Sequence, residues 1–391
     1  MSGRLLRLVC TATVAAHAVL AAVPAAAAPE PAAPEERGVA ALLTDLQRLY
    51  REAEKATEAY NATEERLEKQ RAVARRLDTE LARARLALHD SRGAAGRLAR
   101  QQYQGRSDIS PYVRLLLARD PQHALEQGHV IGQLALERAR TVAELAGSEK
   151  KAGDLARKAR AALDRQLALT ERRKKQRDEV RERLGEVEAL LASLTAEQLT
   201  AVAKLENEGI AEAQRKFMAA GAPSSPRMPT QEGDRAVRYA VRQLGKPYEW
   251  GAEGPRSYDC SGLTSQAWAD AGTPIPRTSQ EQWARLNRVP LKELRPGDLV
   301  VYFPEATHVA MYLGDGMVVQ APRPGAEVKV SPVAANPVLG AVRPDPRGKP
   351  LRHYTPPRLP EGAMDGKDDG YAAATAPEQP RPRATPPRPS R

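Results

Sequence analysis

The chain has 391 residues, and its 60 Lys and Arg side chains outnumber its 49 Asp and Glu side chains, giving a formal net charge of +11 at pH 7. Hydrophobic residues make up 41% of the chain but aromatic residues only 4%, because Ala and Leu supply most of the apolar count. This mixture is typical of long exposed helices and argues against one large compact core. The length allows roughly two to three domains.

The first residues resemble an export signal. Arg4 and Arg7 precede an apolar run from about Leu8 to Val23, and a run of Ala residues follows. A basic start, a short apolar run and a small-residue cleavage site define a secretory signal peptide, which we place at residues 1–28. The run is short and rich in Ala for a bilayer span, so we favour cleavage over a retained membrane anchor. Export also argues against nucleic acid as the partner of this basic chain.

The chain has two cysteines, Cys10 and Cys260. Cys10 lies inside the apolar run rather than after it, so we do not expect it to carry a lipid. Cleavage of the signal leaves Cys260 alone, which excludes an intramolecular disulfide. A lone thiol in an exported protein has either a chemical role or none.

Residues 38–218 are predicted to form two long helices. From Val39 to Leu88 apolar residues recur at steps of three and four with charged residues between them, which is the seam of a coiled coil. Gly105 to Pro111 interrupts the first helix, and a second is expected from about Pro121 to Met218. The pair folds back antiparallel or associates in parallel in a homodimer, and the sequence does not choose.

The helical region allows two interpretations, a passive spacer or an arm that docks a partner or covers the compact domain. A linker rich in Pro, Ser and Gly follows at 219–231, and a basic, proline-rich tail at 346–391 is expected to be disordered. These breaks leave a compact domain at 232–345.

Cys260 belongs to the run Asp259-Cys260-Ser261-Gly262, which opens a predicted helix through Trp268. The free N–H groups and the positive dipole end of such a helix favour thiolate over thiol. A buried structural cysteine is the alternative, but a flanking turn of small and polar residues argues against burial.

A thiolate nucleophile needs a base, and only His308 and His353 lie in or near this domain. His353 falls in the proline-rich exit, whereas His308 begins an alternating stretch that ends in Gly314-Asp315-Gly316, a strand followed by a hairpin turn. The returning strand ends at Gln320, whose side chain is then placed to orient the His308 imidazole. A Cys–His pair with a third orienting residue is the arrangement of papain-like peptidases.

Six ordered motifs now resemble those of the NlpC/P60 cell-wall cysteine peptidases over roughly residues 232–345. They are Gly245-Lys246-Pro247-Tyr248-x-Trp250-Gly251, Asp259-Cys260-Ser261-Gly262-Leu263, Pro276-Arg277-Thr278-Ser279, Leu294-x-Pro296-Gly297-Asp298-Leu299-Val300, His308-Val309-Ala310-Met311-Tyr312-Leu313-Gly314 and Ala321-Pro322-Arg323-Pro324-Gly325. The preceding helical hairpin resembles the secreted actinobacterial members of that family.

The resemblance implies a papain-like α+β domain preceded by a long α-helical coiled-coil hairpin. It implies Cys260 as nucleophile, His308 as general base and Gln320 as the orienting third residue, a position where His is common in the family. Substrate-lining positions are matched by Tyr248, Asp259 and Ser261, whereas Arg277 either binds a substrate carboxylate or braces a loop. No metal or other cofactor is expected, because the domain lacks a His-Glu-x-x-His run and a second cysteine.

The function predicted is a secreted, cell-wall-associated peptidoglycan endopeptidase that cuts the bond between γ-D-glutamyl and the diamino acid of stem peptides. One alternative is an N-acetylmuramoyl-L-alanine amidase, and another is a coiled-coil adaptor of a cell-wall complex with little activity of its own. Besides peptidoglycan, the partners expected are a membrane division complex docked through the coiled coil and the catalytic domain itself. If its partner is the catalytic domain, the helical arm covers the Cys260 cleft and inhibits the enzyme.

Overall fold

The structure is a computed structural model that describes residues 38–104, 113, 120–221 and 227–364. The signal peptide expected at 1–28 and the last part of the tail, from residue 365 onward, lie outside the described residues. No helix among the described residues combines the length and the apolar character that a membrane span requires.

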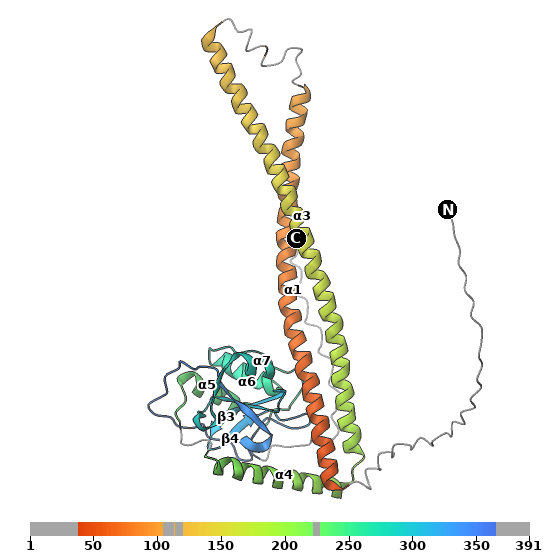
Figure 1. The fold of residues 1–391 in the computed structure, drawn as a ribbon, viewed down its shortest axis with the longest axis vertical. Coiled ribbons are helices and arrows are strands. Elements are labelled where there is room, and N and C mark those ends of the chain that lie inside the picture. The colour runs from red at the N-terminus through yellow and green to blue at the C-terminus, as the bar shows by residue number, and fades with distance from the viewer. Residues whose placement is uncertain (1–37, 105–112, 114–119, 222–226, 365–391) are drawn as a thin grey trace, which may run out of the picture.

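Two long helices dominate the shape of the molecule (Figure 1). Helix α1 (Val39–Gln104) runs away from the compact domain and α3 (Pro121–Ala192) runs back beside it. Cross-helix contacts join residues far apart in sequence, such as Gln70 Nε2 to the Ala162 carbonyl at 2.9 Å. Of the two arrangements that the sequence left open, the structure has the antiparallel pair within one chain, which buries the seam without a second copy.

The second helix is shorter than predicted, because it ends at Ala192 and a separate helix, α4 (Ala196–Ala219), follows. The Thr195 side chain accepts a hydrogen bond from the backbone N–H of Gln198, while the Gln198 side chain accepts from the backbone N–H of Thr195. This reciprocal capping box satisfies the free N–H groups of a new helix and lets the chain turn. The expectation of one helix to Met218 was therefore wrong.

Helix α4 leaves the base of the hairpin and runs along one side of the compact domain (Figure 1). Its first half packs against the base, where Val202 is fully buried in a cluster with Leu42, Leu46 and Val187. Its second half contacts the domain, where Phe217 packs against a buried apolar cluster.

The compact domain is a six-stranded antiparallel sheet with three helices. The strand order is β1-β6-β2-β3-β4-β5. In chain order the elements are α5 (Gln231–Val241), α6 (Cys260–Asp270), α7 (Ser279–Arg285), β1 (Asn287–Val289), β2 (Leu299–Tyr302), β3 (His308–Gly314), β4 (Met317–Gln320), β5 (Lys329–Pro332) and β6 (Val338–Arg343).

The sheet has an apolar core on each face because alternate residues of a strand point to opposite sides. Leu299 and Val301 of β2 face the first core, which Trp268 of α6 fills. Val300 and Tyr302 face the second core, to which α4 contributes Phe217. The expected α+β architecture is confirmed, and α4 is part of how the second face is covered.

Helix α4 ends at Ala219, at the start of the linker expected at 219–231. The C-terminal boundary of the compact domain differs from the one expected. After residue 345 the chain stays on the domain, because the Leu351 N–H donates to the Pro229 carbonyl at 2.8 Å and the Val330 N–H donates to the Ala363 carbonyl at 2.9 Å. A disordered tail starting at 346 is thus wrong for residues 346–364, which are held by backbone hydrogen bonds.

Candidate active site

Cys260 is the first residue of α6, as the sequence predicted. Its neighbour Asp259 caps the helix, with Oδ1 accepting from the Gly262 N–H at 2.6 Å. A side chain at position 262 would collide with the Ala252 carbonyl oxygen, so glycine is required for this tight approach. The cap and the glycine fix the position of the Cys260 thiol.

His308 is the first residue of β3 and is completely buried. Because β3 pairs with β4, Gln320 reaches it, and Gln320 Oε1 lies 2.7 Å from His308 Nε2. The backbone N–H of Val309, the next residue, interacts with the Cys260 sulfur. The structure therefore brings together the three residues that the sequence singled out for catalysis.

Asp259 and Arg277 form a buried ion pair beside the thiol. Arg277 Nη2 lies 2.7 Å from Asp259 Oδ2, its Nε lies 2.5 Å from Glu253 Oε1, and its Nη1 donates to Ser261 Oγ at 2.8 Å. Burial opposes the charge of Arg277, but the Asp259 carboxylate outweighs it and raises the arginine pKa. Because protein groups engage the guanidinium of Arg277 in this conformation, the contacts favour the second of the two roles considered for it, bracing a loop.

Tyr248 is also buried at this site. Burial raises the pKa of its hydroxyl, and the nearby Cys260 and Asp259 raise it further. A neutral phenol near the thiol can donate and accept hydrogen bonds, which is compatible with the substrate-lining position expected for Tyr248.

Helix α1 crosses the Cys260 cleft and places three polar side chains in it. Glu58 is 1% exposed, and Ser261 Oγ donates to its Oε1 at 2.6 Å. The backbone N–H and the hydroxyl of Ser279 donate to its other oxygen at 2.7 and 2.9 Å. The Cys260 sulfur lies 4.0 Å from Glu58 Oε1, so this carboxylate occupies the space directly above the candidate nucleophile.

Glu54 lies one helical turn before Glu58 and contacts the candidate base. Its Oε1 lies 3.2 Å from His308 Nδ1, while its other oxygen is buried without a hydrogen-bond partner. Burial alone would lower the pKa of His308, but the Glu54 carboxylate outweighs burial and raises it. The Glu54 carboxylate therefore favours the charged form of the imidazole, with which it is paired.

Asn61 extends the contact in the other direction, because its Nδ2 donates to Asp259 Oδ2 at 3.0 Å. The adjacent Tyr60 ring meets the Trp250 ring edge-on at 5.1 Å. Residues four and seven positions apart share one face of a helix, so Glu54, Glu58 and Asn61 enter the cleft together.

The docked helix reverses the expected ionisation of Cys260. Burial raises the pKa of the thiol well above its usual value, and Glu58, Asp259 and Glu54 add to this through repulsion of a thiolate. The sequence predicted a lowered pKa from the helix N-terminus alone. Three surrounding carboxylates and the loss of water outweigh that dipole, because a charge without solvent is strongly disfavoured.

Sequence reasoning did not single out Glu54, Glu58 or Asn61. The first helix contains many charged residues, and none of these three has a distinguishing neighbour in sequence. The available signal is compositional: the small residues Ala53, Ala56 and Thr57 surround them, and small residues let a helix approach another surface closely.

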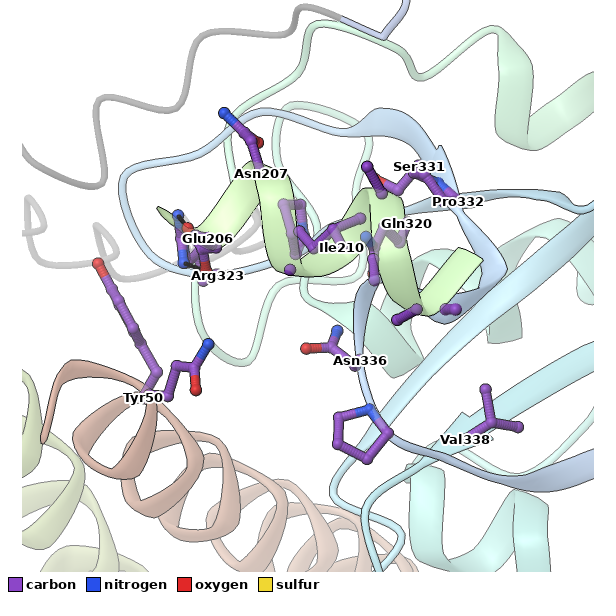
Figure 2. Close-up of a pocket in the computed structure, with 18 of the residues that line it drawn as sticks. Tyr50, Glu206, Asn207, Ile210, Gln320, Arg323, Ser331, Pro332, Asn336 and Val338 are labelled. Atoms are coloured by element: carbon purple, nitrogen blue, oxygen red, sulfur yellow. Dashed lines mark hydrogen bonds and ion pairs between the residues drawn. The ribbon is translucent and has the colours of Figure 1, made fainter. Parts of the chain in front are cut away.

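A cavity of about 820 Å³ continues from the catalytic residues between α1, α4 and the domain (Figure 2). Gln320 and Glu54 line it on the side of His308. Glu206 of α4 and Arg323 of the domain lie together at its rim beside Tyr50 of α1.

Comparison with known proteins agrees with this fold. Residues 245–341 match the NlpC/P60 family, so this chain carries an NlpC/P60 domain, a domain of the cysteine peptidase class. The matched range holds Cys260, His308 and Gln320.

Among its relatives, a probable endopeptidase of Corynebacterium glutamicum is 45% identical over 101 residues, covering 26% of this chain and 48% of that protein. Peptidoglycan endopeptidase RipA of Mycolicibacterium smegmatis is 39% identical over 124 residues, covering 27% of this chain and 25% of that protein. A solved structure of RipD from Mycobacterium tuberculosis, described as a non-catalytic NlpC/p60 domain protein, has a TM-score of 0.27 and 33% identity, covering 29% of this chain and 98% of that one. The chain thus spans about half or less of the length of these two curated relatives.

Proposed function

We propose that this chain is a secreted cysteine endopeptidase of peptidoglycan stem peptides, and that α1 inhibits it in the conformation described above. The observation that carries the proposal is the joint placement of Cys260, His308 and Gln320 beside a pocket that already binds a carboxylate. The NlpC/P60 match and the relatives named as endopeptidases support it.

The mechanism follows from the groups present. With α1 withdrawn, the Cys260 thiolate attacks the scissile amide carbonyl, and N–H groups at the start of α6 stabilise the oxyanion. Imidazolium His308 protonates the leaving amine, and a thioester remains on Cys260. Water activated by neutral His308 then hydrolyses the thioester, while Gln320 Oε1 accepts from Nε2 and holds the ring.

The Glu58 contacts indicate what the acyl side of the substrate carries. Two hydroxyls and one backbone N–H converge on the Glu58 carboxylate. A γ-linked D-glutamyl residue has a free α-carboxylate a few bonds from its scissile carbonyl, which suits such a pocket. The acyl group cut by an amidase, the lactyl ether of muramic acid, has no such carboxylate. The pocket therefore favours the endopeptidase over the amidase.

Inhibition by α1 follows from the same contacts. Glu58 fills the acyl pocket, and Glu54 takes the place of the thiolate as counter-ion of His308. Substrate and α1 compete for the same donors, so catalysis requires that the arm leave. A partner acting on the far end of the α1–α3 hairpin, such as a membrane division complex, is one means to withdraw it.

The test uses the full chain. Glu58→Arg places a guanidinium beside Arg277 and is expected to release α1, so that defined muropeptides are cut between D-glutamate and the diamino acid. Glu58→Arg/Cys260→Ala is the matched control and should cut nothing. Mass spectrometry of the products identifies the bond.

Two outcomes contradict the proposal. Cleavage of the sugar–L-alanine amide would make the chain an amidase. No cleavage by a folded Glu58→Arg chain whose Cys260 is readily alkylated would favour the adaptor, because the arm would then be released without activity.

A further inference from the structure

Helix α1 runs along the cleft, and its contacts identify which end of the cleft receives each part of a substrate. Asn61 and Glu58 contact the acyl side at Asp259 and Ser261, and Glu54 contacts His308. Tyr50 lies one further turn on, about 6 Å along the helix axis. Because His308 protonates the leaving amine, the leaving fragment of a substrate lies beyond His308, where Tyr50 is.

Arg323 is one of the basic residues that line the cavity at this end, together with Arg51 and Lys329. Its Cζ atom lies 4.9 Å from the centroid of the Tyr50 ring. Its Nη1 and Nη2 atoms each donate to one oxygen of the Glu206 carboxylate at 3.1 Å. Arg323 follows Gln320 by three residues, so the two Cα atoms lie at most about 11 Å apart. Both contacts come from the arm, Tyr50 from α1 and Glu206 from α4.

The geometry points to Arg323 as a specificity-determining residue that binds a carboxylate on the leaving fragment of the substrate. This inference rests on the proposed function. In the described conformation Glu206 holds that place, as Glu58 holds the acyl-side pocket, so two glutamates of the arm stand where two substrate carboxylates bind. A planar guanidinium that already makes two parallel bonds to one carboxylate matches another without rearrangement.

The cavity next to Arg323 has room for the leaving fragment. Its volume of about 820 Å³ lies within the usual range for small-molecule sites, and it opens onto Gln320 and Glu54 beside His308. Asn336 also lines it and offers an amide group to a peptide backbone (Figure 2). A dipeptide of a diamino acid and D-alanine can therefore enter while α1 is still docked, provided that the Glu206 carboxylate is no longer bound to the Arg323 guanidinium.

The test measures binding in the full chain without hydrolysis. The probe is meso-diaminopimelyl-D-alanine, compared by calorimetry with the same dipeptide whose carboxylates are all amidated. In a Glu206→Gln chain the free acid should bind roughly tenfold or more tighter than the amide, since a charged hydrogen-bonded pair is lost. The wild-type chain should bind the acid more weakly than the Glu206→Gln chain does.

Variants of Arg323 in the Glu206→Gln background test whether the preference for the free acid depends on this residue. Arg323→Gln should remove the preference for the acid, and Arg323→Lys should keep part of it, because a charge remains without the bidentate geometry. Arg347→Gln, which removes an exposed arginine of the same domain, is the matched control and should change nothing. Circular dichroism verifies that each variant is folded.

Equal affinity for acid and amide, equal effects of Arg323→Gln and Arg347→Gln, or no binding of the acid up to its solubility would each overturn the inference. Failure of the proposed hydrolysis gives a different result. A chain that cuts no muropeptide but binds the acid through Arg323 keeps the binding site and loses the enzymatic activity.

Discussion

At the residue scale, the docked site is a set of charges arranged to keep a nucleophile protonated. An active Cys–His pair holds a thiolate beside an imidazolium. Here Glu54 is the anion beside His308, and Glu58 and Asp259 repel a thiolate at Cys260. The proposed inhibition would therefore be electrostatic as well as steric.

Glu58 makes the docking of α1 on the domain depend on pH. Burial, followed by the Asp259 charge, raises the pKa of Glu58 from 4.5 to about 7 in the docked state. Docking therefore takes up a proton, so its stability is greatest below the undocked pKa and is lost as pH rises through about 7. The raised pKa of docked His308 acts with the same sign.

We expect Cys260 alkylation to reveal this dependence when wild type is compared with Glu58→Gln, which mimics the protonated carboxyl. We take the ratio of the Cys260 alkylation rate in wild type to that in Glu58→Gln. The intrinsic reactivity of the thiol cancels in this ratio, because both chains carry the same cysteine. The ratio should be near one at about pH 5 and rise by roughly tenfold at about pH 8. A ratio that stays constant would show that Glu58 does not titrate on undocking.

Arg277 leads to a prediction about stability. It is 9% exposed and paired with the fully buried Asp259. Arg277→Gln leaves that carboxylate uncompensated and should lower the free energy of unfolding by about 3–5 kcal/mol in urea denaturation. Arg285→Gln, an exposed helical ion pair, should cost below about 1 kcal/mol. Equal losses would contradict the bracing role.

At the element scale, α4 determines where α1 meets the domain. Gln214 donates to the Gly316 carbonyl at 2.9 Å and accepts from the Ala334 N–H at 3.0 Å, while Val202 anchors the other end in the hairpin base. A helix fixed at both ends sets the register of α1 in the cleft. The α1–domain contact thus relies on α4 as well as on the cleft.

Gln214→Ala should therefore loosen α1 without touching the catalytic groups. We expect a roughly several-fold faster alkylation of Cys260 in the full chain, since two hydrogen bonds worth about 1 kcal/mol each are lost. Arg215→Ala, the exposed neighbour, is the control. No change in Gln214→Ala would show that α1 docks independently of α4.

At the scale of the whole molecule, the hairpin base, α4 and the domain enclose one junction, while the far ends of α1 and α3 diverge (Figure 1). Leu125, Leu134 and Leu136 near that far end are exposed. The contacts of the hairpin with the domain thus lie at one end of the molecule, and the far end of the hairpin lies away from them.

Release at the junction should change the shape of the molecule. A Glu58→Arg/Gln214→Ala chain loses contacts from both α1 and α4, so its domain should move away from the hairpin. Small-angle scattering should then give a larger radius of gyration than that of wild type or Arg215→Ala. An unchanged radius together with rapid alkylation would indicate local loosening only.

The sequence alone predicted the two long helices, the start of α6 at Cys260, and the pairing of His308 with Gln320. Each depends on a local pattern: heptad spacing, a helix cap and a strand–turn–strand. The break at Thr195 had a local signal as well, the capping box with Gln198, which was overlooked.

Only the tertiary structure placed Glu54, Glu58 and Asn61 in the cleft and Glu206 on Arg323. These contacts join positions from 117 residues apart, for Glu206 and Arg323, to 308 − 54 = 254 residues apart, for Glu54 and His308. The first three of these arm residues look like ordinary charged or polar residues of a solvated helix. What distinguishes them is desolvation by a surface that comes later in the chain. Local patterns in the sequence thus specified the candidate catalytic groups. Their environment in this conformation, a thiol with a raised pKa beneath a docked helix, was decided by packing between distant segments.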